Sequence, residues 1–142
     1  MPKVAITGHT SGLGAALFER FSVSDDVVGL SRSNGFDIRD INGICERVKD
    51  CDIFINNAYD RYSQVDLLYS VYDMWKGKDK KIINIGSLAT FGIRDELKPY
   101  AIHKIALQEA HYQVAVQLNS CKSYLFTIGY IENKNPQVAE LI

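Results

Sequence analysis

Residues 7–14, TGHTSGLG, place three glycines within eight positions, between the apolar run KVAI (3–6) and the amphipathic segment AALFERF (15–21). A flexible turn from a strand to a helix would explain these glycines. A turn whose backbone must come very close to a large anion would explain them equally well, because glycine lacks the side chain that would hold the anion away. The elements on either side of the stretch decide between the two explanations.

Short apolar runs alternate with segments of helical periodicity along the chain. The runs at 4–6, 27–30, 53–55, 82–85 and 123–128 have the composition of strands. Several are continuously apolar, which is typical of parallel strands buried on both faces. Four sets of apolar residues recur at helical spacing: Leu13, Leu17, Phe18 and Phe21; Ile41, Ile44, Cys45 and Val48; Val65, Leu68, Tyr72 and Trp75; and Leu107, Ala110, Val114 and Leu118.

This alternation predicts an α/β fold, a doubly wound parallel sheet of the Rossmann type with right-handed crossovers. Two residues mark helix starts. Asp40 is placed as an N-cap of the second helix, and Pro99 suits the first turn of the fourth, where a missing N–H does no harm. We expect residues 1–142 to form a single domain.

Composition excludes several classes of protein. Sixteen basic and seventeen acidic side chains leave almost no net charge, so we expect neither a nucleic acid nor a membrane surface as partner. The three cysteines form no disulfide framework and no metal-ligand cluster, which favours buried thiols in a reducing cytoplasm and no metal site. No segment looks like a signal peptide or a membrane span, so we expect a soluble protein.

The glycine stretch now has a context, because it joins the first strand of a parallel sheet to the first helix. Such folds bind the phosphates of a dinucleotide at this turn. Three further fragments follow in order: NNAY (56–59) directly after a strand, INIGS (83–87) ending in Ser87, and YAIHK (100–104). In the last fragment Tyr100 and Lys104 lie one turn apart on one helical face.

In these four fragments the sequence resembles the short-chain dehydrogenase/reductase family, from residue 2 to about residue 133. The resemblance implies that Ser87, Tyr100 and Lys104 form the catalytic group. It also implies a cofactor site, in which Asp37 meets the adenine ring, Asn57 braces the sheet and Asn133 touches the carboxamide. The implied cofactor residues are Gly8, Thr10, Ser11, Gly12, Leu13, Gly14, Ser31, Arg32, Asp37, Asn57, Ala58, Tyr100, Lys104, Ile131 and Asn133.

The chemistry of carbonyl reduction explains these residue types. Hydride addition leaves an alkoxide that needs a proton, and a free tyrosine, with a pKa of about 10, needs a nearby cation to work as the acid. Lys104 would supply that cation and hold the nicotinamide ribose, while Ser87 would orient the substrate oxygen. His103 lies off this face, and we interpret it as a surface or wall residue.

The end of the second strand bears on the choice of cofactor. There GLSRS (29–33) offers Ser31 and Arg32 and no acidic residue for a ribose 2′-hydroxyl. Because an arginine at this place accommodates a 2′-phosphate, we expect NADP(H), with NAD(H) as the alternative.

The sequence also departs from the family. The helix between the second and third strands is absent, and the third strand, near FDIRD (36–40), must be tiny. The relay asparagine has no counterpart; Gln64, Asp66 and Ser70 are polar candidates, none at a convincing position. Only PQVAELI follows residue 135, so the C-terminal end is truncated relative to the family. The chain is then a minimal member, a fragment, or a subunit completed by a partner.

These observations favour an NADP(H)-dependent oxidoreductase that interconverts a small carbonyl compound and a secondary alcohol. The alternatives are a dinucleotide-binding protein without catalysis, acting as a sensor or assembly subunit, and an incomplete reductase that needs a partner chain. We expect a homodimer or homotetramer that associates through the long helices. The tyrosines at 59, 62, 69 and 72 could line a ligand pocket, form a dimer contact or pack an amphipathic helix.

Overall fold

The computed structural model describes residues 2–92 and 96–129 of the chain. Its centre is a parallel sheet of five strands in the order β2-β1-β3-β4-β5. The strands are β1 (Lys3–Thr7), β2 (Asp26–Leu30), β3 (Ile53–Asn56), β4 (Lys81–Ser87) and β5 (Lys122–Ile128). Each of the five apolar runs predicted as a strand forms one, and all four neighbouring pairs are parallel. The predicted Rossmann-type α/β fold is confirmed.

Four helices connect these strands. They are α1 (Gly12–Ser22), α2 (Ile41–Val48), α3 (Ser63–Trp75) and α4 (Pro99–Ala115), with short 3-10 turns η1 (Arg32–Asn34) and η2 (Leu88–Thr90). Both predicted helix starts are confirmed. The Asp40 carboxylate accepts a hydrogen bond from the Gly43 backbone N–H at 3.1 Å, and Pro99 is the first residue of α4.

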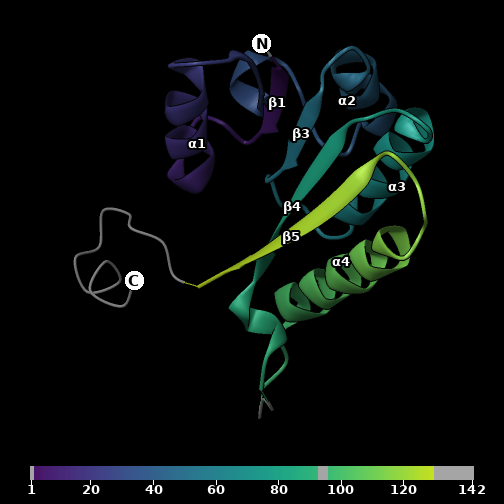
Figure 1. Cartoon of the computed structure of the whole chain (residues 1–142). Helices are drawn as coiled ribbons and strands as arrows, with labels where there is room; N and C mark the ends of the chain where they lie inside the picture. Colours follow the sequence, from purple (N-terminus) through teal and green to yellow (C-terminus); the bar gives the residue numbers. More distant parts are fainter. Residues whose placement is uncertain (1, 93–95, 130–142) are drawn as a thin grey trace.

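The helices cover the two faces of the sheet unequally. Helices α2, α3 and α4 lie on one face and α1 lies on the other (Figure 1). The larger core lies under the three helices and includes Phe54, Leu68, Trp75 and Leu107, all fully buried. The smaller core lies under α1, where Leu17 and Phe21 pack against strand residues.

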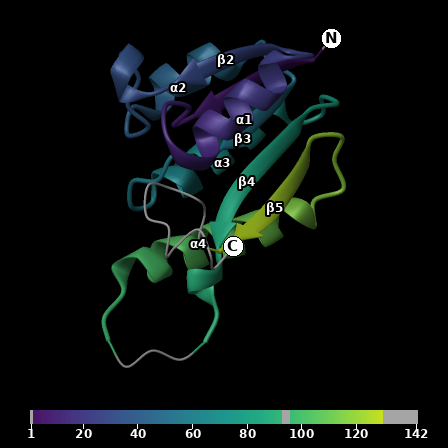
Figure 2. The same ribbon diagram turned by 90° about the vertical axis from the view of Figure 1, so that its left-hand side faces the viewer.

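On the side of α1, the described residues leave part of the sheet without a helix in front of it. Figure 2 turns this face to the viewer: α1 lies over the β1 side of the sheet, while no helix within residues 2–92 and 96–129 lies in front of β4 and β5. Tyr124 and Phe126 of β5 are consequently 42% and 54% exposed. The rings of Tyr124 and Phe126 are therefore apolar surface that the described part of the chain leaves uncovered.

Two details differ from the expectations or sharpen them. Leu118 was predicted on the apolar face of the fourth helix, and this is wrong: α4 ends at Ala115 and Leu118 is fully exposed. Between β2 and α2 the connecting helix is absent as expected, and η1 takes its place. Residues 36–40 form no strand at all, so the expected short strand there is wrong as well.

The remaining expectations concern cysteines and membranes. All three cysteines are free thiols; Cys51 and Cys121 are buried and Cys45 is half-buried. Within the described ranges, no helix combines the length and apolar character needed to cross a bilayer.

Candidate active site

Three adjoining hollows lie along the carboxyl ends of the strands. The middle hollow reaches from the glycine turn to Tyr100 and Lys104. A second hollow lies at the end of β2, and it shares Gly8, Ala58 and Tyr59 with the middle one. A third shares Tyr100 with the middle hollow and extends to Ser87. Open α/β sheets bind ligands at this edge, so the sequence motifs converge where the fold places a site.

The glycine turn has a backbone that other residues would adopt only with strain. Gly8 and Gly12 have φ angles of +71° and +56°, and α1 begins at Gly12. A Cβ atom on Gly14 would lie 1.9 Å from the Gly8 carbonyl oxygen, so this contact requires glycine. The turn therefore brings bare backbone and a helix N-terminus to the middle hollow, an arrangement that fits an anionic group.

Hydrogen bonds attach the glycine turn to the loop after β3. The Thr7 hydroxyl oxygen accepts from the backbone N–H groups of Asn57 and Ala58, both at 3.0 Å. The Asn57 side-chain amide donates to the carbonyl oxygens of Thr7 and Gly8 at 3.0 and 3.3 Å. Asn57 thus braces the carboxyl ends of β1 and β3, and Thr7 is a site residue that the sequence analysis quoted without giving it a role.

Lys104 and Tyr100 lie on the face of α4 that meets the middle hollow. Lys104 is only 3% exposed, and its ammonium donates to Gln64 Oε1 at 2.7 Å and to the Ile85 carbonyl oxygen at 3.0 Å. Its Nζ lies 5.6 Å from the centroid of the Tyr100 ring. Burial lowers the pKa of Lys104 to about 8. Tyr100 is 41% exposed, so its hydroxyl can reach a bound molecule.

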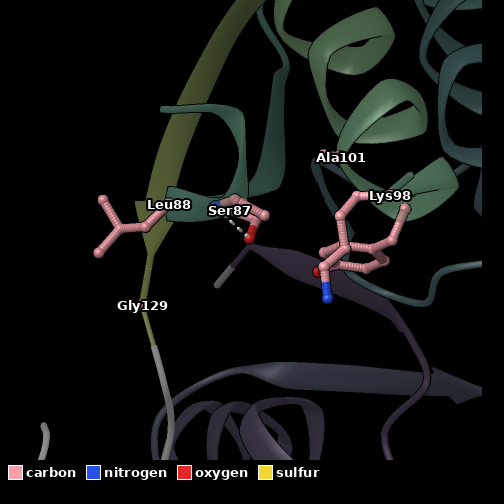
Figure 3. Close-up of a pocket in the computed structure, with 7 residues that line it drawn as sticks. Ser87, Leu88, Lys98, Ala101 and Gly129 are labelled. Atoms are coloured by element: carbon pink, nitrogen blue, oxygen red, sulfur yellow. Dashed lines mark hydrogen bonds between the residues drawn. The ribbon is translucent and has the colours of Figure 1, made fainter. Parts of the chain in front are cut away.

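Ser87 lines the third hollow, at the tip of β4. Figure 3 shows Ser87 and Leu88 on one side of this hollow and Lys98 and Ala101 on the other. The Ser87 hydroxyl oxygen accepts a hydrogen bond from the Ala89 backbone N–H at 3.0 Å and thereby caps η2. That bond fixes the oxygen and leaves the hydroxyl proton for a ligand.

An aromatic group joins the hollows. Tyr59 packs edge-on against Tyr100 with 4.7 Å between ring centroids, and its hydroxyl is hydrogen-bonded to His103 Nδ1 at 2.6 Å. Tyr62 packs edge-on against His103. His103, which was interpreted as a surface or wall residue, is therefore a hydrogen-bond partner of Tyr59, one of the tyrosines that the sequence offered as a possible pocket lining. Burial raises the pKa of Tyr59.

The four clustered tyrosines turn out to have different environments. Tyr59 lines the site, Tyr72 packs in the core, and Tyr69 is partly exposed and donates to Gln113 at 2.7 Å. The pocket and helix-packing interpretations therefore each describe part of the cluster.

A cluster of four charged side chains lies at the end of β2, and two of them, Arg32 and Asp60, line the hollow there. Arg32 lies 3.5 Å from a carboxylate oxygen of Asp60 and 3.9 Å from one of Asp37. Arg39 binds Asp37 at 2.6 Å, and this guanidinium holds the pKa of Asp37 well below its ordinary value. Asp37 does not line the hollow, whereas its neighbours Phe36 and Ile38 and the unpredicted Asp60 do.

The other predicted residues are distributed as follows. Thr10 and Ser31 line the hollow at the end of β2, and Ser11 and Leu13 line the middle one. Ile131 and Asn133 lie outside the described residues. Gln64, one of the polar candidates without a convincing position in the sequence, reaches Lys104 directly. Among residues 2–92 and 96–129, no group of three or more His, Cys, Asp or Glu side chains could hold a metal ion.

No protein-family model matches the sequence, and no curated protein matches it. Solved structures do match. A short-chain dehydrogenase from Burkholderia cenocepacia J2315 in complex with NADP has a TM-score of 0.80 at 18% identity, over 94% of this chain and 74% of that one. A small-chain dehydrogenase has a TM-score of 0.78 at 17% identity, over 99% and 86% of the two chains.

A serine dehydrogenase complexed with NADP+ has a TM-score of 0.71 at 16% identity, over 90% of this chain and 72% of that one. The chain therefore has the fold of the short-chain dehydrogenases/reductases, over most of its length, as the motifs in the sequence predicted.

Proposed function

We propose that this chain, which has the short-chain dehydrogenase/reductase fold, is an oxidoreductase that uses NADP(H) to interconvert a small carbonyl compound and a secondary alcohol. The observation that carries the proposal is the convergence of the glycine turn, Lys104 and Tyr100 on one hollow, with Ser87 in the next. Similar structures that were solved with NADP or NADP+ support the choice of cofactor.

The residues at this edge of the sheet fit a dinucleotide. The bare backbone around Gly8 and the N-terminus of α1 would hold the pyrophosphate. Arg32, exposed at the end of β2, would hold the 2′-phosphate. Lys104 has one ammonium proton left after its two hydrogen bonds, and it would donate this proton to the ribose. When bound, the nicotinamide supplies the hydride.

The chain's own side chains would supply the acid and the charge. The Tyr100 hydroxyl would donate its proton to the oxygen of the reduced carbonyl, and would take it back in the oxidation direction. The Lys104 charge, 5.6 Å from the Tyr100 ring, favours the phenolate left behind. Ser87 would donate its free hydroxyl proton to the same substrate oxygen and hold it in place.

Asp60 supports NAD(H) as a second candidate cofactor. Its carboxylate lies beside Arg32 in the hollow at the end of β2, where it could accept hydrogen bonds from ribose hydroxyls. One of the similar structures, a 4-hydroxyisoleucine dehydrogenase, is complexed with NADH.

Titration of the protein into NADPH and into NADH, followed by nicotinamide fluorescence, tests the proposal. We expect saturable binding of both cofactors, with NADPH bound more tightly. Arg32→Ala should remove that preference by weakening NADPH binding about tenfold. Arg20→Ala, which removes an exposed arginine of α1, is the control and should change neither affinity. If neither cofactor binds, the proposal is wrong and the chain keeps only the fold.

The proposal also covers the compartment and the oligomeric state of the protein. The free thiols of Cys45, Cys51 and Cys121 fit a reducing cytoplasm. Three partly exposed apolar residues on the outer face of α4, namely Ile102, Ile105 and Tyr112, support association of two copies through this long helix.

The second candidate function is that of a dinucleotide-binding protein without catalysis, acting as a sensor or assembly subunit. The partial exposure of Tyr100 favours this second candidate, because the described residues leave the reacting hydroxyl open to water. Cofactor binding without turnover on any of a panel of small carbonyl compounds would establish it.

A further inference from the structure

The position of the Lys104 ammonium depends on one polar side chain from α3. Gln64 is 2% exposed, and its Oε1 accepts from Lys104 Nζ at 2.7 Å, the shorter of the two hydrogen bonds that this ammonium makes. Lys104 forms no ion pair within the described residues. Both of its hydrogen bonds go to neutral oxygen atoms, so this cation is held by hydrogen bonds rather than by a carboxylate.

The orientation of the Gln64 amide is fixed by its other contacts. Its Nε2 donates to the carbonyl oxygen of Asn56 at 2.8 Å and to that of Ile85 at 3.3 Å. A flipped amide would point its oxygen at two carbonyl oxygens and its NH2 group at an ammonium, so only one orientation satisfies every group. Oε1 is therefore the atom that must face Lys104.

The backbone of Gln64 is fixed as well. The Asn56 side-chain amide donates to the Gln64 carbonyl oxygen at 2.8 Å and to Asn84 Oδ1 at 3.1 Å. These bonds join the first turn of α3 to β3 and β4 through buried groups. Gln64 is thus held at both its backbone and its side chain, which leaves its oxygen little freedom to move.

We propose that Gln64 is the positioning residue for Lys104: its amide oxygen holds the ammonium beside the paired rings of Tyr59 and Tyr100, 5.6 Å from each centroid, and leaves one N–H free to act. This inference rests on the proposed function for its consequence in catalysis. A neutral amide suits the task, because a carboxylate in its place would cancel the positive charge that the Tyr100 phenolate needs.

The role proposed for Gln64 can be tested through the pKa of Lys104. The titratable groups that face its ammonium are Tyr59 and Tyr100, each with its ring centroid 5.6 Å from Nζ. Burial lowers the pKa of Lys104 to about 8, so the ammonium loses its charge as the pH rises through that value. Turnover that depends on the charge should fall in the same range.

Two substitutions should move this pKa in opposite directions. Gln64→Met keeps the volume but removes the oxygen that stabilises the charged form, so the pKa of Lys104 should fall. Gln64→Glu places a carboxylate there, so the pKa should rise by about one unit or more. Gln117→Met, at an exposed glutamine beyond α4, is the control and should leave it unchanged.

The pKa is read from the 13C resonance of the Lys104 Cε in protein labelled at lysine, assigned by its loss in Lys104→Arg. Opposite shifts in the two variants, with kcat of Gln64→Met lower by about tenfold, support the proposal. A purely structural role would lower the Tm of both variants and leave the resonance titrating as in the wild type, and that result overturns it. Because the resonance needs neither cofactor nor turnover, a wild type that binds no NADPH would refute the proposed function and leave this test intact.

Discussion

At the scale of single residues, hydrogen bonds fix two of the three predicted catalytic side chains, and ring contacts hold the third. Lys104 is held by Gln64 and Ile85, and the Ser87 oxygen is held by the backbone of η2. Tyr100 differs, because it is held by ring contacts and partly exposed. Under the proposed function its hydroxyl would be the group that meets a substrate, so removing it should affect the chemistry and little else.

Tyr100→Phe tests this difference. The ring and its contacts with Tyr59 and Lys104 remain, so NADPH affinity should stay nearly unchanged. Without the proton donor, kcat for carbonyl reduction should fall by about 10²- to 10⁴-fold. Steady-state kinetics and NADPH fluorescence measure the two quantities. Tyr69→Phe, on the exposed side of α3, is the control and should keep the wild-type kcat. Equal turnover in Tyr100→Phe would refute the assignment of Tyr100.

At the scale of elements, buried polar side chains link the strands and helices beneath the site. Asn84 of β4 is fully buried, and its amide donates to the Ser123 hydroxyl at 3.0 Å and to the Tyr124 carbonyl oxygen at 3.1 Å. The Ser123 hydroxyl is in turn hydrogen-bonded to His111 of α4 at 2.8 Å. Together with the bond from Asn56, these contacts join β3, β4, β5 and α4 through side chains as well as through the sheet.

Asn84→Leu should therefore destabilise the fold. The substitution keeps the volume but removes three hydrogen bonds and leaves buried partners unsatisfied, so the free energy of unfolding should fall by about 2–3 kcal/mol. Urea denaturation measures the change. Asn42→Leu, at an exposed position of α2, is the control and should shift the value by less than about 0.5 kcal/mol. An unchanged midpoint in Asn84→Leu would show that this network adds nothing to stability.

At the scale of the whole molecule, the described residues leave apolar surface uncovered in two places. One is the face of β4 and β5 opposite α4, with Tyr124 and Phe126. The other is the outer face of α4, where Ile102 and Ile105 are followed by Tyr112 at helical spacing. The second supports the proposed association through the long helices, because a helix face can meet its own copy about a twofold axis.

Ile105→Glu tests that association. Ile105 is 44% exposed, and a charge buried at a helix–helix contact should weaken self-association about 100-fold or more. Sedimentation velocity should find a dimer or tetramer for the wild type and a monomer for the variant. Val23→Glu, an exposed apolar residue at the end of α1, is the matched control and should leave the oligomer intact. A wild type that is monomeric, or a variant that still associates, contradicts the proposal.

The sequence by itself determined the elements and their order. Strands and helices formed where continuous apolar runs and helical periodicity predicted them, because both patterns are local and repeat along each element. Asp40 and Pro99 marked helix starts for the same reason. Leu118 was wrong because an apolar residue at the right spacing cannot show where the helix stops. The order of the motifs also predicted the edge of the sheet at which Tyr100, Lys104 and the glycine turn meet.

Only the tertiary structure decided which side chains touch. Gln64 lies 40 positions from Lys104 in the sequence, and Asp60 lies 28 positions from Arg32, so no local pattern links either pair. The tertiary contacts also packed Tyr59 against Tyr100, 41 positions further along the chain. The physical reason is that parallel strands bring their carboxyl ends to one edge whatever their separation along the chain, while hydrogen bonding and charge decide there which groups pair.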